Sequence, residues 1–357
     1  MFGGYCMKRP IPQYVEEMVD GAVSRLKNLQ VGNTVSFAFI TDIHNCTEYT
    51  ERALYAIQKI NKDVPVSFTC MGGDYLCNNS RTTHNEAIAQ HNELGELVKK
   101  YGNKPAIMVV NGNHDNNAFG VAESVLEADE IYDILMPHHK KVFVCDDKAP
   151  KSMYGYYDDE ENKLRAIFLN VMDTGYTKDN AKQYIHSGAF GNRQLNWVAN
   201  TALKLPSPEW GVVVFGHFEP IPNPFVETEL VFGGAAMWEI LKAFKNGTAY
   251  CASEKKGELF YDVSCDFTEQ GESELIGYFC GHHHNDWVWK NAQITLISHL
   301  SAASDNFGTS ICSDGIKHAK TRGSGEESAF SVFTINRDTK RISCIRCGAG
   351  PDFGVNY

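Results

Sequence analysis

The stretch that decides the fold runs from residue 35 to residue 44 and reads Val-Ser-Phe-Ala-Phe-Ile-Thr-Asp-Ile-His. Residues 35–40 are apolar enough for a buried strand, and the polar block Asp42-Ile43-His44 begins two residues later. An extended backbone would turn Asp42 and His44 to the same side, where both can bind one ion, while Ile43 points away. The stretch therefore predicts a strand that ends in a pair of metal ligands.

The same order of apolar run and polar block recurs four times along the chain. The runs are residues 66–71, 106–110, 212–215 and 275–280, and the blocks after them contain Asp74, Asn113-His114-Asp115, His217 and His282-His283-His284. Open α/β sheets bind ligands beyond the carboxyl ends of their strands, because several loops converge there. We therefore expect the five blocks to meet at one edge of the sheet.

Apolar residues at helical spacing fill several of the intervals between these strands. The clearest stripe runs from Ala87 to Val98, opens with a Thr83-x-x-Glu86 capping box and closes near Gly102. Similar stripes lie within residues 13–30, 195–203 and 237–244. This alternation predicts an α/β fold whose sheet is covered on its faces. We expect one catalytic domain, residues 35–357, with an N-terminal helical segment, residues 1–34, packed on it.

Composition narrows the class of protein. The formal net charge of −11 argues against a nonspecific binder of duplex DNA or anionic membranes, since clustered Lys and Arg normally hold such partners. The first ten residues lack the apolar core of a secretory signal, and no later run approaches a membrane span. Eleven scattered cysteines favour reduced thiols, and we interpret the Cys344-x-x-Cys347 pair as strand residues. We therefore expect a cytoplasmic protein with no membrane or nucleic-acid partner.

The blocks offer carboxylates, imidazoles and one carboxamide as metal ligands. This set suits Mn, Fe or Zn rather than a thiolate-bound structural zinc. A carboxylate can bridge two ions, and Asp74 is the best-placed residue for that role. Two divalent ions roughly 3.5–4 Å apart would activate water and clamp an in-line displacement at phosphorus.

The ordered set D-x-H, G-D, G-N-H-D, G-H and G-H-x-H, spanning residues 42–284, resembles that of the calcineurin-like metallophosphoesterase superfamily. The resemblance implies a four-layer sandwich of two mixed β-sheets flanked by helices, and in-line attack by a metal-bound hydroxide. It implies that Asp74 bridges two ions, the first held by Asp42, His44 and His284 and the second by Asn113, His217 and His282. It further implies that His114 contacts the phosphate and assists the leaving group. We expect the neighbouring Asp115 to orient the imidazole of His114 and favour its protonated form.

Substrate contacts are less well marked in the sequence. Serine/threonine phosphatases of this superfamily extend the second block to G-D-x-x-D-R, whereas this chain has Gly73-Asp74-Tyr75-Leu76-Cys77-Asn78, so the usual phosphate-binding Arg is missing. Asn78 and His186 are candidate substrate contacts, although an ordinary surface loop is the favoured explanation for each position. We expect His91, on the helical stripe, to lie at the surface.

The pattern predicts a hydrolase that cleaves a phosphomonoester or phosphodiester. Its substrate is a phosphoester, but the blocks do not distinguish nucleotide, protein, sugar or lipid esters, and they predict no particular protein partner. A Mn-dependent nuclease is a narrower alternative, opposed by the acidic composition. A noncatalytic scaffold of the same fold is a second alternative, opposed by the presence of a competent residue at every ligand position.

Overall fold

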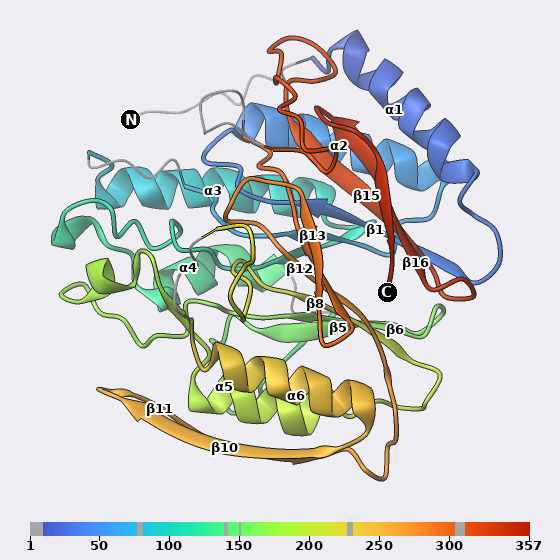
Figure 1. The fold of residues 1–357 in the computed structure, drawn as a ribbon. Helices are drawn as coiled ribbons and strands as arrows, with labels where there is room; N and C mark the ends of the chain where they lie inside the picture. The colour runs from blue at the N-terminus through green and yellow to red at the C-terminus, as the bar shows by residue number, and fades with distance from the viewer. Residues whose placement is uncertain (1–9, 77–80, 139–141, 150, 227–230, 304–310) are drawn as a thin grey trace.

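Two β-sheets lie face to face, and helices cover the outer side of each, which gives four layers (Figure 1). The structure is a computed structural model that describes residues 10–76, 81–138, 142–149, 151–226, 231–303 and 311–357. The predicted α/β fold class, with two mixed sheets flanked by helices, is therefore confirmed.

The first sheet contains the strands that lead into the first three polar blocks. Its order is β17 (Phe353–Asn356), β16 (Arg341–Gly348), β15 (Ala329–Asn336), β1 (Thr34–Ile40), β2 (Phe68–Met71) and β3 (Ala106–Val109). β1, β2 and β3 are parallel, whereas β15 runs antiparallel to β1. The carboxyl ends of β1, β2 and β3 consequently lie at the same edge.

The second sheet contains the strands that lead into the other two blocks. Its order is β13 (Trp287–Asn291), β14 (Ile294–Ser298), β12 (Glu274–Cys280), β8 (Gly211–Phe215), β6 (Leu164–Phe168), β5 (Gly155–Asp159) and β4 (Phe143–Cys145). β6, β8, β12 and β14 are parallel to their neighbours within this group. The carboxyl ends of β8 and β12 are therefore adjacent as well.

Aromatic rings fill the space between the sheets and fix their relative position. Phe37 of β1 stacks on Phe68 of β2, with ring centroids 5.2 Å apart. Its ring also meets the edges of Phe215 of β8 and Phe279 of β12, at centroid distances of 5.3 Å and 5.2 Å. Each such pair contributes about 0.5–1.5 kcal/mol beyond the burial of its area. This packing holds β1, β8 and β12 together just below the polar blocks.

Helices cover the outer faces. Residues of α1 (Gln13–Lys27), α2 (Thr47–Asp63), α3 (His84–Tyr101) and α4 (Ala128–Leu135) join the core of the first sheet, while α5 (Asn192–Trp197), the π-turn after it (Val198–Ala202) and α6 (Gly234–Asn246) join that of the second. Among the described residues, the shorter elements are three 3₁₀ turns (Ala122–Ser124, Met136–His138 and Ala181–Tyr184) and the paired strands β7 (Gly188–Ala189) and β9 (Val231–Phe232). None of the described helices is both long and apolar enough to cross a membrane.

Several local predictions are confirmed in detail. All five strands expected before the polar blocks are present. The Thr83 side chain accepts from the Glu86 amide, and the Glu86 carboxylate accepts from the Thr83 amide. The helix they open ends at Tyr101, with Gly102 as its C-cap. Cys344 and Cys347 lie in β16, where burial raises the pKa of each thiol to about 12. These thiols are free and have the character of buried strand residues.

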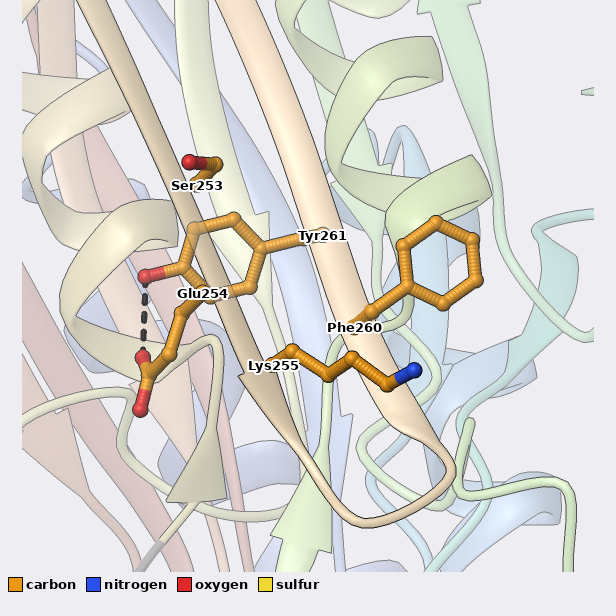
Figure 2. A pocket seen from close by; sticks show the side chains of 5 residues that line it. All are labelled: Ser253, Glu254, Lys255, Phe260 and Tyr261. Atoms are coloured by element: carbon orange, nitrogen blue, oxygen red, sulfur yellow. Dashed lines mark hydrogen bonds between the residues drawn. The ribbon is translucent and has the colours of Figure 1, made fainter.

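A hairpin of β10 (Ala249–Lys256) and β11 (Leu259–Asp266) packs on α5 and α6 at the outer side of the second sheet (Figure 1). A shallow hollow of about 500 Å³ lies on it, lined by Ser253, Glu254, Lys255, Phe260 and Tyr261. Figure 2 shows the Tyr261 hydroxyl donating to Glu254, at 3.0 Å. None of these five residues belongs to the polar blocks, so the hollow is separate from the strand ends that carry the candidate ligands.

Candidate metal centre

The five polar blocks converge where the carboxyl ends of the two sheets meet. β1 is followed by Asp42 and His44, β2 by Asp74, β3 by Asn113, β8 by His217, and β12 by His282 and His284. The first five of these side chains are buried and the last two are half-buried. The predicted meeting of the blocks is therefore seen, with side chains from five strands and both sheets facing one place.

The backbone of the blocks is strained in a way that the sequence did not indicate. Five residues have positive φ, between 43° and 69°: Asp42, His44, Asp74, His282 and His284. Residues other than glycine adopt this region rarely, and such strain persists only where surrounding contacts enforce it, most often at functional sites. The expectation that an extended backbone aligns Asp42 with His44 is therefore wrong, because left-handed turns place these side chains.

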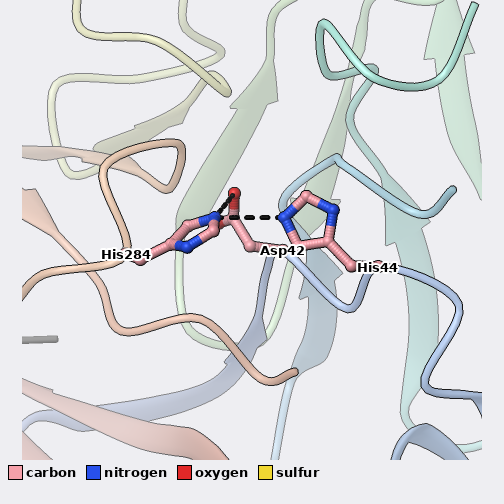
Figure 3. A group of neighbouring side chains, drawn as sticks. All are labelled: Asp42, His44 and His284. Carbon is pink, nitrogen blue, oxygen red and sulfur yellow. Dashed lines mark hydrogen bonds and ion pairs between the residues drawn. The ribbon is translucent and has the colours of Figure 1, made fainter. Parts of the chain in front are cut away.

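Asp42, His44 and His284 form one group of candidate metal ligands. Figure 3 shows the two imidazoles turned toward each other beside the Asp42 carboxylate. The Nε2 atoms of His44 and His284 are 3.1 Å apart, and His284 Nε2 lies 3.3 Å from Asp42 Oδ1. His44 Nδ1 donates to the carbonyl of Leu76 at 3.2 Å, which directs the lone pair of its Nε2 toward an ion. Three donor atoms thus point at one position.

His217, His282 and Asp74 form a second group. His217 Nε2 lies 3.1 Å from Asp74 Oδ2 and 3.1 Å from Asn113 Oδ1, while its Nδ1 donates to the carbonyl of Gly72 at 2.8 Å. That hydrogen bond again directs Nε2 toward an ion. Asp74 also groups with His44 and His114, and within each group the ligand atoms lie within 4.8 Å of one another. Asp74 therefore lies between the two sets of ligands.

Buried charge makes this region suited to cations. Burial opposes ionisation of Asp42, but its contacts with His284 and the charge of His217 hold the pKa of this carboxyl well below its usual range. Burial likewise opposes ionisation of Asp74, yet His217 and His114 hold its pKa far below the ordinary value. His217 in turn has a pKa raised to about 10, because the two carboxylates outweigh the effect of burial. Two buried anions surrounded by imidazoles are an arrangement that divalent ions stabilise.

His114 borders both groups. Its Nε2 lies 3.8 Å from Asp74 Oδ2, and its ring is 4.9 Å from that of His44. Burial lowers the pKa of this imidazole, although the charge of Asp74 opposes the shift. The ring stacks on Phe119, with centroids 4.4 Å apart. His114 therefore has a defined orientation beside the candidate ligands, as a residue that contacts the substrate would require.

The partners that the structure gives the Asp115 carboxylate are backbone amides, and its expected role toward His114 stays a prediction. Its carboxylate accepts hydrogen bonds from the backbone amides of Gly112 at 2.7 Å, Tyr75 at 2.6 Å and Asp74 at 3.1 Å. These three donors occupy both carboxylate oxygens, and none of them is the imidazole of His114. Burial and the nearby charge of Asp74 raise the pKa of Asp115 to about 7. Asp115 therefore ties the second block to the third, which positions the ligands in them.

His91 is also not where the sequence analysis placed it. The side chain is fully buried, and its Nε2 donates to the backbone carbonyl of Asp115 at 2.9 Å. Burial lowers the pKa of this imidazole to about 4. His91 therefore supports the third block from α3 as a neutral side chain.

Because His91 is neutral in the folded protein, we expect the free energy of unfolding to fall in acid. Because the folded pKa of about 4 lies below the ordinary value of 6.5, the unfolded chain binds the extra proton between these pH values. The free energy of unfolding therefore falls as the pH drops through this window, by about 3 kcal/mol in all, and the group has no effect above it. Urea titrations of the wild type and His91→Gln at several pH values check this. A difference between the two proteins that does not change with pH would contradict it.

The two candidate substrate contacts have different outcomes. Asn78 lies outside the described residues. His186 is exposed, and its ring meets the edge of Phe119 at 5.9 Å, on the ring that stacks on His114. The preceding Ile185 accepts from the Asn113 side chain at 2.9 Å. The loop around His186 therefore lies beside the candidate ligands, and its contact with substrate stays a prediction.

Some supporting residues were not predicted. Ser301 donates to the carbonyl of Asp42 at 2.8 Å, and Lys320 donates to the carbonyl of Ser301 at 2.6 Å. Glu219, buried two residues after His217, accepts from His283 at 2.9 Å. Only Glu219 had a sequence signal, its nearness to a block. The others reach the site through tertiary contacts of segments far away in the chain.

Comparison with known proteins identifies a family. The model of the calcineurin-like phosphoesterase family matches residues 35–286, which include every candidate ligand. No curated protein matches the chain.

Three solved structures are similar at low identity. A predicted phosphoesterase from Streptococcus pneumoniae is 10% identical, with 91% of this chain and 98% of that chain covered and a TM-score of 0.33. GAP50, the anchor in the inner membrane complex of Plasmodium, is 12% identical, with 87% and 83% covered and a TM-score of 0.42. Phosphopantetheinyl hydrolase from Mycobacterium tuberculosis is 12% identical, with 76% and 91% covered and a TM-score of 0.34.

Proposed function

Because the chain belongs to the calcineurin-like phosphoesterase family, we propose that it is a dinuclear metal-dependent hydrolase of a phosphomonoester or phosphodiester. The observation that carries the proposal is the position of Asp74, which belongs to a ligand group with His44 and to another with His217 and His282. A single carboxylate between two sets of imidazoles can bridge a pair of divalent ions.

Seven side chains would hold the two ions. Asp42, His44 and His284 would bind one, while Asn113, His217 and His282 would bind the other, with Asp74 between them. Oxygen and nitrogen donors without a thiolate suit Mn, Fe or Zn. When bound, the ions would activate a water molecule and neutralise charge on the phosphoryl oxygens.

His114 is the proposed acid of this chain. Its imidazole is partly accessible, with 21% of the side chain exposed, and its Nε2 is 3.8 Å from Asp74 Oδ2. A phosphoester held beside Asp74 would lie within reach of this nitrogen, which can donate a proton to the departing oxygen. Stacking on Phe119 restrains the ring for that transfer.

Metal removal provides the direct test of this proposal. We expect chelator-treated protein to lose hydrolysis of p-nitrophenyl phosphate, and we expect Mn, Fe or Zn to restore it at about two ions per chain. Activity and metal content are measured on the same samples, with a linear DNA and bis-p-nitrophenyl phosphate as further substrates. Hydrolysis that survives complete metal removal would contradict the proposal. Fewer than two ions in inactive, metal-replete protein would favour the scaffold alternative.

A further inference from the structure

The loop after His217 is anchored directly to the block that carries His282 and His284. Glu219 is buried and accepts from His283, the residue between those two ligands, at 2.9 Å. The same carboxylate oxygen accepts from the Asn223 side chain at 2.6 Å, and Asn223 accepts from the amide of Phe225 at 2.9 Å. Three prolines, at positions 220, 222 and 224, fix φ between these contacts. The position of Phe225 is thus set relative to the candidate metal centre.

Phe225 extends a series of aromatic rings that begins at the candidate ligands. The rings of His282 and His283 have centroids 4.7 Å apart, and His283 lies 5.5 Å from Trp287, the first residue of β13. Phe225 stacks on Trp287 at 5.4 Å, with 27° between the ring planes, and meets the edge of Trp289 at 6.1 Å. The series leads from the ligands to the surface, where Phe225 is 51% exposed.

This exposed ring differs from an ordinary apolar surface residue. Phe260 of the distant β10–β11 hairpin is 52% exposed, but no ring of the described residues stacks on it. The hydrogen-bonded loop and Trp287 hold Phe225 in one place. When a ligand ring covers Phe225, the protein therefore loses little conformational entropy. Such a ring would gain stacking energy and remove apolar area from water.

We infer that Phe225 and Trp287 form a binding surface for a planar aromatic ring in the organic group of the phosphoester, such as an aryl group or a nucleobase. The inference rests on the proposed function, because a phosphate held at the ligands would direct its organic group toward one side of the site. His283 connects that side to Trp287. The surface would favour phosphoesters whose organic group contains an aromatic ring. Stacking would not distinguish strongly between different rings.

The test compares an aryl ester with an alkyl ester in the same preparations. We expect Phe225→Ala to reduce the preference for p-nitrophenyl phosphate over glycerol phosphate, as a ratio of kcat/KM values, by about three- to tenfold through KM. Phe225→Tyr should restore the preference, because it keeps the stacking ring. Phe260→Ala, a matched exposed phenylalanine, should leave it unchanged.

The outcomes separate this inference from the proposed function. An unchanged preference in Phe225→Ala, with both esters hydrolysed, would overturn the binding surface and leave the hydrolase intact. If the wild type hydrolyses neither of these monoesters, nor bis-p-nitrophenyl phosphate or DNA, the proposed function fails. Titration with adenosine monophosphate while tryptophan fluorescence is followed then decides the surface. Quenching that Phe225→Ala loses and Phe260→Ala keeps would support it. Equal quenching in both variants, or none in the wild type, would overturn it.

Discussion

We expect Asp74→Asn to lower kcat/KM for hydrolysis of an aryl phosphate by about a thousandfold. The two side chains have the same size, and the carbonyl oxygen of the introduced carboxamide can still accept from the amide of His114, which donates to Asp74 Oδ1 at 2.9 Å. The variant loses the negative charge and one of the two oxygens that lie between the ligand groups. We therefore expect metal content, measured on the same protein, to fall below that of the wild type.

A buried aspartate at the other end of the strands provides the control. Asp159 closes β5 and is 8% exposed, and its carboxylate accepts from Ser67 and Asn162. Asp159→Asn should retain the activity and metal content of the wild type, because its partners lie outside the candidate ligands. Thermal unfolding shows whether Asp74→Asn remains folded. A folded Asp74→Asn protein with wild-type kcat/KM would refute the proposed role of Asp74.

The candidate ligands were predictable because the order of residues alone indicates where each of them lies. An apolar run predicts a buried strand, and parallel strands bring the residues after them to one edge. This is why Asp42, Asp74 and His217 were predicted to meet although they are far apart in the sequence. The left-handed φ of Asp42 and His282 was not predictable, because neither is glycine. Tertiary contacts hold these turns, including the His282 amide donating to the Asp42 carboxylate at 3.1 Å.

Asp115 shows why the role of a residue is harder to predict than its presence at a site. Its place beside His114 in the sequence suggested a side-chain pair. In the structure its partners are backbone amides. Almost every residue has such an amide, so the residue types in the sequence do not indicate these partners. His91 was misplaced for a related reason, since its partner is a backbone carbonyl.

The helix α2 and the β10–β11 hairpin were missed for different reasons. The helix α2 carries a buried stripe that includes Ala53, Ile57 and Ile60, so a signal of helical spacing was present and was overlooked. In the hairpin, Tyr261, Val263 and Cys265 of β11 are buried at alternate positions. Their burial depends on docking against α5 and α6, which the alternation does not specify.

Asp115→Ala is expected to lower the free energy of unfolding by about 3–5 kcal/mol, because it removes the acceptor of three buried backbone amides. Each amide without a partner costs about 1–3 kcal/mol, reduced here by any water that enters the space. Urea unfolding of the metal-depleted protein gives this value without the contribution of bound ions. Asp115→Asn should lose less, because its single carbonyl oxygen can still accept from Gly112 and Asp74, whose amides share one oxygen in the wild type.

The control variant Asp146→Ala distinguishes the loss of backbone anchoring from the simple loss of a buried carboxylate. Asp146 is 4% exposed and also accepts three hydrogen bonds, but only that from Lys148 comes from a backbone amide, the others coming from the side chains of Tyr154 and Arg193. The half-exposed Arg193 can turn toward water after Asp146→Ala, so that only the Lys148 amide and the hydroxyl of the buried Tyr154 lose an acceptor. The three amides around Asp115 are all fixed by the strands beside them. We therefore expect Asp146→Ala to cost less than half as much as Asp115→Ala. Equal losses would mean that the three amides find other partners, and the assignment of Asp115 as the tie between the second and third blocks would then be wrong.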